Sequence, residues 1–122
     1  MDSKEYIKQA IRTESDKFTG IHNYRLLHGA MGIVTEAGEL MDAMKKVMFY
    51  KRELDRINLI EELGDLFWYV ALMCDELGVS FDEVMQKNIA KLMARYPEKF
   101  TVEDEQNRKL GVERGVLEGY GL

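Results

Sequence analysis

The sequence predicts an all-α protein, a helical bundle of four main helices with no sheet. Only one proline, Pro97, interrupts the 122 residues, and proline is the residue that helix interiors tolerate least. Valine, isoleucine and threonine are scattered rather than alternating, so the pattern of a half-buried strand is missing. The composition, 46% hydrophobic and 32% charged, is that of an ordinary globular protein.

Caps and stops delimit the first three helices. We expect the first over residues 3–18 and the second over residues 24–50, after a cap at Asn23. The third starts near Asp55 and ends before Gly78, because glycine readily adopts the left-handed backbone that terminates a helix.

Ser80 and Glu83 have the spacing of a capping box, which opens the fourth helix, and Pro97 ends it. Thr101 caps a short fifth helix. Residues 1–110 therefore form one domain. Residues 111–122 hold four glycines and have weak periodicity, so they form a C-terminal arm that is either packed on a neighbouring subunit or partly mobile.

The second and third helices carry more apolar surface than a monomer can bury, and homo-oligomerisation is the natural way to cover it. A net charge of −5 offers no basic surface for nucleic acid and favours a small polyanion bound by a local cluster. With no signal peptide and no apolar run of membrane length, we expect a cytoplasmic protein without a membrane partner. The lone Cys74 is expected in the core.

Two copies of one pattern carry the chemistry: Glu36-Ala37-Gly38-Glu39-Leu40 and, 26 residues later, Glu62-Leu63-Gly64-Asp65-Leu66. Residues three apart on a helix are neighbours, roughly 5–6 Å between Cβ atoms, so each copy presents two carboxylates. If the helices are antiparallel, the two pairs can face each other. Four clustered acids repel, and a hard divalent cation such as Mg²⁺ relieves the repulsion. We interpret the glycine inside each copy as a packing residue.

Other residues share these helix faces. Arg25, Gly29, Gly32 and Lys46 continue the stripe of the first acid pair. The two glycines either leave room for a ligand or allow close helix packing, and the two cations either bind phosphate or are solvated. On the third helix Glu61 is a fifth acid or an exposed surface residue.

Aromatic and polar residues complete the set of candidates. Tyr69 shares the face of Asp65 and can flank a base or ribose, whereas the neighbouring Trp68 is expected in the core. Asn88, Lys91 and Arg95 form one polar stripe on the fourth helix. Alone, the stripe would be a solvated face, but opposite an acid-bound cation it becomes a phosphate clamp.

These residues resemble the hallmark of the MazG-like family of all-α nucleoside triphosphate pyrophosphohydrolases, Glu-x-x-Glu followed some twenty residues later by Glu-x-x-Asp. The similarity covers residues 26–100, including the segments 61–69 and 88–97. It implies Mg²⁺-dependent cleavage between the α and β phosphates of (deoxy)nucleoside triphosphates, with Mn²⁺ as a substitute metal. It also implies a homo-oligomer, dimer or tetramer. The implied metal ligands are Glu36, Glu39, Glu62 and Asp65, and the implied nucleotide contacts are Asn88, Lys91 and Arg95.

Several alternatives stay open at this level. Glu39 or Glu61 could take the proton of the attacking water. Phosphoribosyl-ATP is an alternative substrate, and a non-catalytic helical module that binds a nucleotide or a partner is an alternative function. A redox di-iron bundle is disfavoured, because neither His22 nor His28 has an acid three residues before it.

Overall fold

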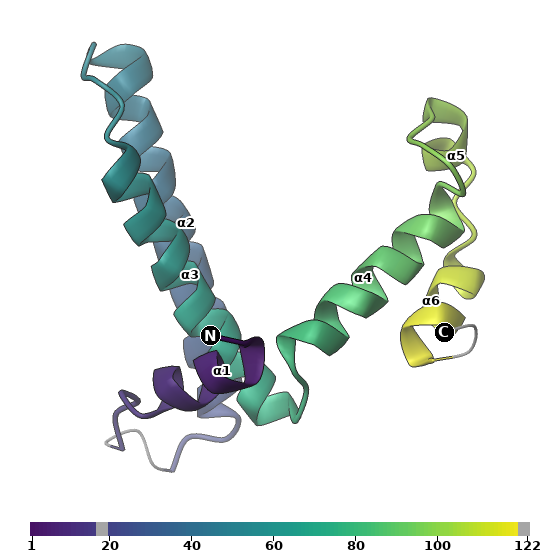
Figure 1. Cartoon of the computed structure of the whole chain (residues 1–122), viewed down its shortest axis with the longest axis horizontal. Helices are drawn as coiled ribbons and strands as arrows, with labels where there is room; N and C mark the ends of the chain where they lie inside the picture. The colour runs from purple at the N-terminus through teal and green to yellow at the C-terminus, as the bar shows by residue number, and fades with distance from the viewer. Residues whose placement is uncertain (17–19, 120–122) are drawn as a thin grey trace. The chain divides into compact units, whose positions relative to one another are not determined.

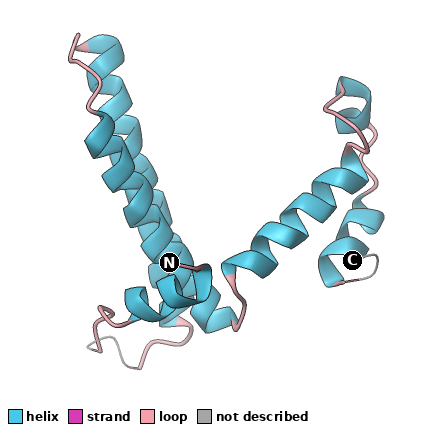
Figure 2. Cartoon of the chain, in the orientation of Figure 1, coloured by secondary structure: helices cyan, strands magenta, loops and turns pink. Residues whose placement is uncertain are grey.

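The computed structural model describes residues 1–16 and 20–119, and all regular structure in this part of the chain is helical (Figure 2). The prediction of an all-α protein is therefore confirmed. The helices fall into two compact units, Met1–Ser80 and Phe81–Leu122. The first holds α1 (Ser3–Ile11), α2 (Tyr24–Phe49) and α3 (Arg56–Leu77), and the second holds α4 (Phe81–Arg95), α5 (Val102–Gln106) and α6 (Leu110–Glu118). A bundle of four helices stays a prediction.

The first unit is built on a long hairpin in which α2 and α3 pack against each other (Figure 1). Asp55 caps α3 by accepting a hydrogen bond from the Asn58 amide at 3.1 Å, and Gly78 ends it in the left-handed region with φ of 70°. Both ends agree with the sequence prediction. Asn23 does precede α2, but it adopts a left-handed backbone and its side chain makes no capping hydrogen bond.

Helix α1 is shorter than predicted, ending at Ile11 instead of near residue 18, which lies outside the described residues. The amide and the hydroxyl of Thr13 both donate to the Ala10 carbonyl, at 3.0 and 2.8 Å, and this turn closes the helix. Trp68 of α3 donates its indole N–H to the same carbonyl and to Thr13 Oγ1. Trp68 therefore anchors the end of α1, but it is half-buried and not one of the fully buried core residues, contrary to the expectation that it lies in the core.

Two glycines of α2 allow the hairpin to pack closely. A methyl group on Gly32 would overlap the ring of Tyr69, and one on Gly29 would overlap the side chain of Met73. Of the two explanations open from the sequence, close helix packing is the correct one. Gly38 and Gly64, by contrast, have no neighbouring atom within 4 Å of an added Cβ. The prediction that these two are packing glycines is wrong, because they lie on open helix surface.

This difference gives a matched pair of substitutions. Gly32→Ala should destabilise the protein by about 1–3 kcal/mol, because the added methyl displaces the Tyr69 ring from a packed position. Gly38→Ala adds a methyl in open space and should stabilise α2 by about 0.5–1 kcal/mol through the helix propensity of alanine. Urea unfolding of both variants measures the effects. Equal effects of the two substitutions would contradict the packing described here.

In the second unit α6 packs on α4 through a buried carboxylate. Glu113 is 4% exposed and accepts hydrogen bonds from Arg95 and Arg108, both at 2.7 Å. Thr101 caps α5 by accepting from the Asp104 amide at 3.0 Å, as predicted. The sequence predicts an arm over residues 111–122. Residues 111–118 of it belong to α6, and the ion pair between Glu113 and Arg95 fixes this helix to α4.

The ion pair makes the second unit sensitive to acid. The hydrogen bond from Arg95, then that from Arg108, lowers the pKa of Glu113 to about 2 from its ordinary 4.5. A carboxyl whose pKa is lowered by folding stabilises the fold above its unfolded pKa, and this contribution disappears as the pH falls through the folded pKa. The stability difference between the wild type and Glu113→Gln should therefore shrink from pH 5 toward pH 2. Urea titrations monitored by circular dichroism test this, and a difference independent of pH would contradict it.

Few side chains are fully buried in the described part of the chain. Ala71 and Leu72 of α3 are inaccessible, and Cys74 is buried beside them, as expected for a core cysteine. Large apolar residues elsewhere on the hairpin face solvent, among them Val34, Met41 and Ile57, each at least 70% exposed. None of the described helices combines the length and apolar character needed to cross a membrane.

Candidate metal and nucleotide site

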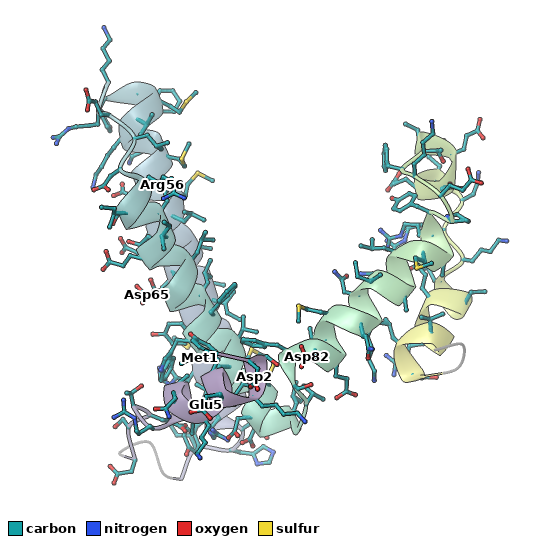
Figure 3. All side chains as sticks on the ribbon, viewed as in Figure 1. Met1, Asp2, Glu5, Arg56, Asp65 and Asp82 are labelled. Carbon is teal, nitrogen blue, oxygen red and sulfur yellow. The ribbon has the colours of Figure 1, made fainter. Side chains whose placement is uncertain are left out.

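The hairpin brings three of the predicted acids together. Glu36 of α2 and Glu62 and Asp65 of α3 each offer a carboxylate oxygen, and these oxygens lie within 4.8 Å of one another. Glu36 and Glu62 are half-buried, whereas Asp65, labelled on the hairpin in Figure 3, is exposed. Three carboxylates at this separation form a donor set that suits a hard divalent cation. We call Glu36, Glu62 and Asp65 the acid cluster.

The acid cluster is electrostatically unfavourable without a cation. The pKa of Glu62 is raised, first by desolvation and then by the charge of Glu36, followed by Asp65, Glu39 and Glu61. The pKa of Tyr6 is raised as well, first by burial and then by the charge of Asp65. A carboxylate whose pKa is raised by neighbouring negative charges lies in an environment that a bound cation stabilises.

A cavity of about 380 Å³ opens on one side of the acid cluster, where the α2–α3 turn closes the hairpin. Glu62 and Glu39 border it at the cluster end, and Lys46 and Arg52 border it at the turn. Lys46 also forms an ion pair of 2.9 Å with Asp42. The cavity thus places the fourth predicted acid, Glu39, next to Glu62 and near two cations. Its remaining lining residues are Asp42, Ala43, Val47, Glu53, Leu54, Asp55, Asn58 and Leu59.

A second cavity, of about 420 Å³, lies on the other side and shares Glu36 and Asp65. Its walls are aromatic: the Tyr69 ring meets the Trp68 ring edge-on with centroids 5.0 Å apart and the His28 ring at 5.5 Å. Thr13 and Ser15 add hydroxyl groups. Flat rings with a few hydroxyls can accommodate a nucleobase and a ribose. The acid cluster therefore lies between an aromatic cavity and a cavity that holds two cations.

Arg25 lies elsewhere in the first unit. Its guanidinium donates to Glu14 at 2.9 Å and to Asp75 and Glu76 at 2.7 Å. The pKa of Arg25 is raised, chiefly by the hydrogen bond to Glu14. Three carboxylates neutralise this cation, and through them Arg25 joins the loop before α2 to the end of α3. Arg25 therefore has a structural role in the first unit.

The remaining predicted residues are not gathered around the acid cluster within the first unit. Glu61 is exposed and lines neither cavity, although its charge contributes to the raised pKa of Glu62. Asn88, Lys91 and Arg95 belong to α4 in the second unit. Of these, Arg95 donates to Glu113 through Nε at 2.7 Å.

Sequence reasoning missed Arg52, Thr13 and Ser15 as lining residues. No helix stripe contains them, because all three lie in the segments outside α1, α2 and α3. Helical periodicity carries no information about such positions. The rings of His28 and Trp68, neither of which was expected at the site, form part of the wall of the second cavity, and Trp68 also donates to the Ala10 carbonyl.

Fold and site together define a class: an all-helical protein with carboxylates of two antiparallel helices facing one another. A family model described as the MazG nucleotide pyrophosphohydrolase domain matches residues 28–100. The chain belongs to this family, since the match spans more than half of its residues. The matched region contains both acid pairs, the α2–α3 turn and the polar stripe of α4.

Two curated proteins are similar to this chain, and neither printed name states an activity. Gene 37 protein of Mycobacterium phage L5 is 36% identical over an alignment of 100 residues, and the match covers 79% of this chain and 74% of that protein. Uncharacterized protein YvdC of Bacillus subtilis (strain 168) is 32% identical over an alignment of 73 residues, and the match covers 52% of this chain and 69% of that protein. No solved structure gives a significant match.

Proposed function

We propose that the protein is a Mg²⁺-dependent nucleoside triphosphate pyrophosphohydrolase that cleaves between the α and β phosphates and releases a nucleoside monophosphate and pyrophosphate. The observation that carries the proposal is the acid cluster, Glu36, Glu62 and Asp65, within a chain of the MazG nucleotide pyrophosphohydrolase family. The aromatic cavity on one side and the cation-containing cavity on the other provide space for the two ends of such a substrate.

The metal ligands in this proposal are the three residues of the acid cluster and Glu39, which shares a cavity with Glu62. The donor set fits Mg²⁺ because all of its members are carboxylates, and Mn²⁺ has similar ligand preferences. A bound divalent ion neutralises phosphate charge and lowers the pKa of a coordinated water. Phosphoryl transfer otherwise requires mainly positioning, so the proposed reaction needs no covalent nucleophile from the chain.

The residues around the acid cluster have distinct proposed tasks. Tyr69, packed against Gly32 and the His28 ring, presents a fixed aromatic edge to the nucleoside. Glu39 is the proposed acceptor of the proton from the attacking water, through the carboxylate oxygen that does not bind the metal, because it is exposed and borders the cavity that Glu62 lines. Glu61, which lines neither of the two cavities beside the acid cluster, is the weaker choice.

The α4 stripe contributes to the same proposal. Lys91 forms no ion pair among the described residues, whereas Arg95 donates to the buried Glu113. We therefore assign the phosphate contact to Lys91, with Asn88 beside it, and treat Arg95 as a residue that orients α4. We also propose a homo-oligomer, which would cover the exposed apolar side chains of α2 and α3.

The proposal is tested by measuring pyrophosphate release from a panel of ribo- and deoxynucleoside triphosphates, with Mg²⁺ and with a chelator. The expected result is Mg²⁺-dependent formation of equal amounts of monophosphate and pyrophosphate. Release of inorganic phosphate with a diphosphate product would contradict the cleavage site. Absence of turnover across the panel would redirect the assignment to phosphoribosyl-ATP or to a non-catalytic binding module.

A further inference from the structure

Arg52 stands apart from the other arginines of the described chain. Arg25, Arg95, Arg108 and Arg114 all form ion pairs with carboxylates. No ion pair occupies Arg12, Arg52 or Arg56 among the described residues, and of these three only Arg52 lines a cavity that reaches the acid cluster. The guanidinium of Arg52 forms no ion pair within the described chain, so its N–H groups can donate to a phosphate. The carboxylates nearby are compatible with such an anion when a metal ion is bound to it.

The backbone of the turn holds Arg52 in this position. The carbonyl of Lys46, in the last turn of α2, accepts hydrogen bonds from the Tyr50 amide at 3.2 Å and from the Arg52 amide at 3.1 Å. Between them Lys51 adopts a left-handed conformation with φ of 54°. This arrangement folds the chain back over the end of α2, so Arg52 and Lys46 border one cavity together.

The geometry points to Arg52 as a phosphate-binding residue that, with Lys46, receives the pyrophosphate end of the substrate. The inference rests on the proposed function and deepens it by giving the substrate a direction across the acid cluster. The nucleoside end lies toward Tyr69, Trp68 and His28, and the two terminal phosphates lie toward the α2–α3 turn. The chemistry of the walls supports this direction, because the aromatic cavity has no cation among its lining residues and the other cavity has two.

Arginine suits this task better than lysine alone. Its planar guanidinium can donate two parallel hydrogen bonds to a phosphate, which fixes orientation as well as charge. Lys46 is already paired with Asp42 at 2.9 Å, so Arg52 is the lining cation whose guanidinium is not engaged in an ion pair among the described residues. Glu39, Asp42, Glu53, Asp55 and Glu62 line the same cavity, so we expect phosphate to bind there together with its metal ion rather than alone.

The test is calorimetric titration of pyrophosphate into the full-length protein in the presence of Mn²⁺, for the wild type, Arg52→Gln and Arg56→Gln. Arg56 is the matched control, since it is an unpaired arginine in the first turn of α3 that does not line the cavity. Loss of a charge-assisted phosphate contact should weaken pyrophosphate binding about tenfold in Arg52→Gln. Binding of Mn²⁺ alone and of a nucleoside monophosphate should stay unchanged in both variants.

The outcomes separate this inference from the proposed function. Unaltered pyrophosphate binding in Arg52→Gln, an equal loss in Arg56→Gln, or an equal loss of monophosphate binding would each overturn the assignment of Arg52. Absence of pyrophosphate binding in the wild type with Mn²⁺ would overturn it too. A wild type that binds pyrophosphate through Arg52 but hydrolyses no triphosphate would refute the proposed reaction and leave the binding site standing.

Discussion

Asp65→Asn should abolish pyrophosphate release while leaving the helical fold intact. The substitution keeps the size of the side chain and removes one of the three carboxylate charges of the acid cluster. Asp65 is exposed, so its replacement leaves no cavity and no unpaired buried group. Loss of a group that stabilises charge in a transition state typically costs about a hundredfold or more in rate. We expect at least that loss, measured as pyrophosphate formed from the best triphosphate of the panel with saturating Mg²⁺.

The control for this variant is Asp16→Asn, an equivalent change at an exposed aspartate that lines neither cavity. It should retain wild-type turnover. Circular dichroism spectra and melting curves of both variants establish that the fold persists. Turnover by Asp65→Asn at more than a tenth of the wild-type rate would remove Asp65 from the proposed metal ligands.

Glu62→Gln should distinguish the effect of the acid cluster on stability without metal from its effect on metal binding. Partial burial and the charges of Glu36 and its neighbours raise the pKa of Glu62. A carboxyl whose folded pKa is raised binds protons more tightly in the folded state, so its ionised form disfavours folding as the pH rises through that pKa. At neutral pH and without metal, the neutral glutamine variant should therefore melt at a higher temperature than the wild type.

Bound metal should reverse the order of the two melting temperatures, so that the wild type melts higher than Glu62→Gln. A cation that binds only the folded state stabilises it by about 2.7 kcal/mol at a concentration one hundred times its Kd. The wild type should gain this stabilisation with Mg²⁺ or Mn²⁺, and Glu62→Gln should gain much less, because one ligand is missing. The control is Glu98→Gln, at an exposed glutamate outside the acid cluster, which should follow the wild type. A Glu62→Gln variant with a full metal-induced shift would show that Glu62 is not a ligand.

Much of the fold could be predicted from the sequence because its signals are local. Asp55, Gly78, Pro97 and Thr101 delimit helices through short-range backbone chemistry, and the structure places the corresponding ends where these residues indicate. The end of α1 was missed, since it depends on Trp68, more than fifty residues away, donating to the Ala10 carbonyl. Gly38 was misjudged for the related reason that sequence does not reveal which side of a glycine faces another helix.

The candidate site divides in the same way. Helical spacing predicted that Glu36, Glu62 and Asp65 lie close together, because residues three apart share one face of a helix and the two helices are antiparallel. Spacing also suggested Arg25 as a phosphate ligand, but it could not reveal the three carboxylates that surround its guanidinium. Arg52 was invisible to this reasoning, since its position depends on the left-handed turn at Lys51.

The most direct test of the central claim is hydrolysis of a triphosphate in ¹⁸O-labelled water with Mg²⁺, followed by mass analysis of the products. Attack of water at the α phosphorus beside the acid cluster predicts one labelled oxygen in the nucleoside monophosphate and none in pyrophosphate. Asp65→Asn should yield neither product. Label in pyrophosphate would show attack at the β phosphorus, and label in inorganic phosphate would show cleavage at the terminal phosphate. Either result would contradict the reaction proposed for this chain.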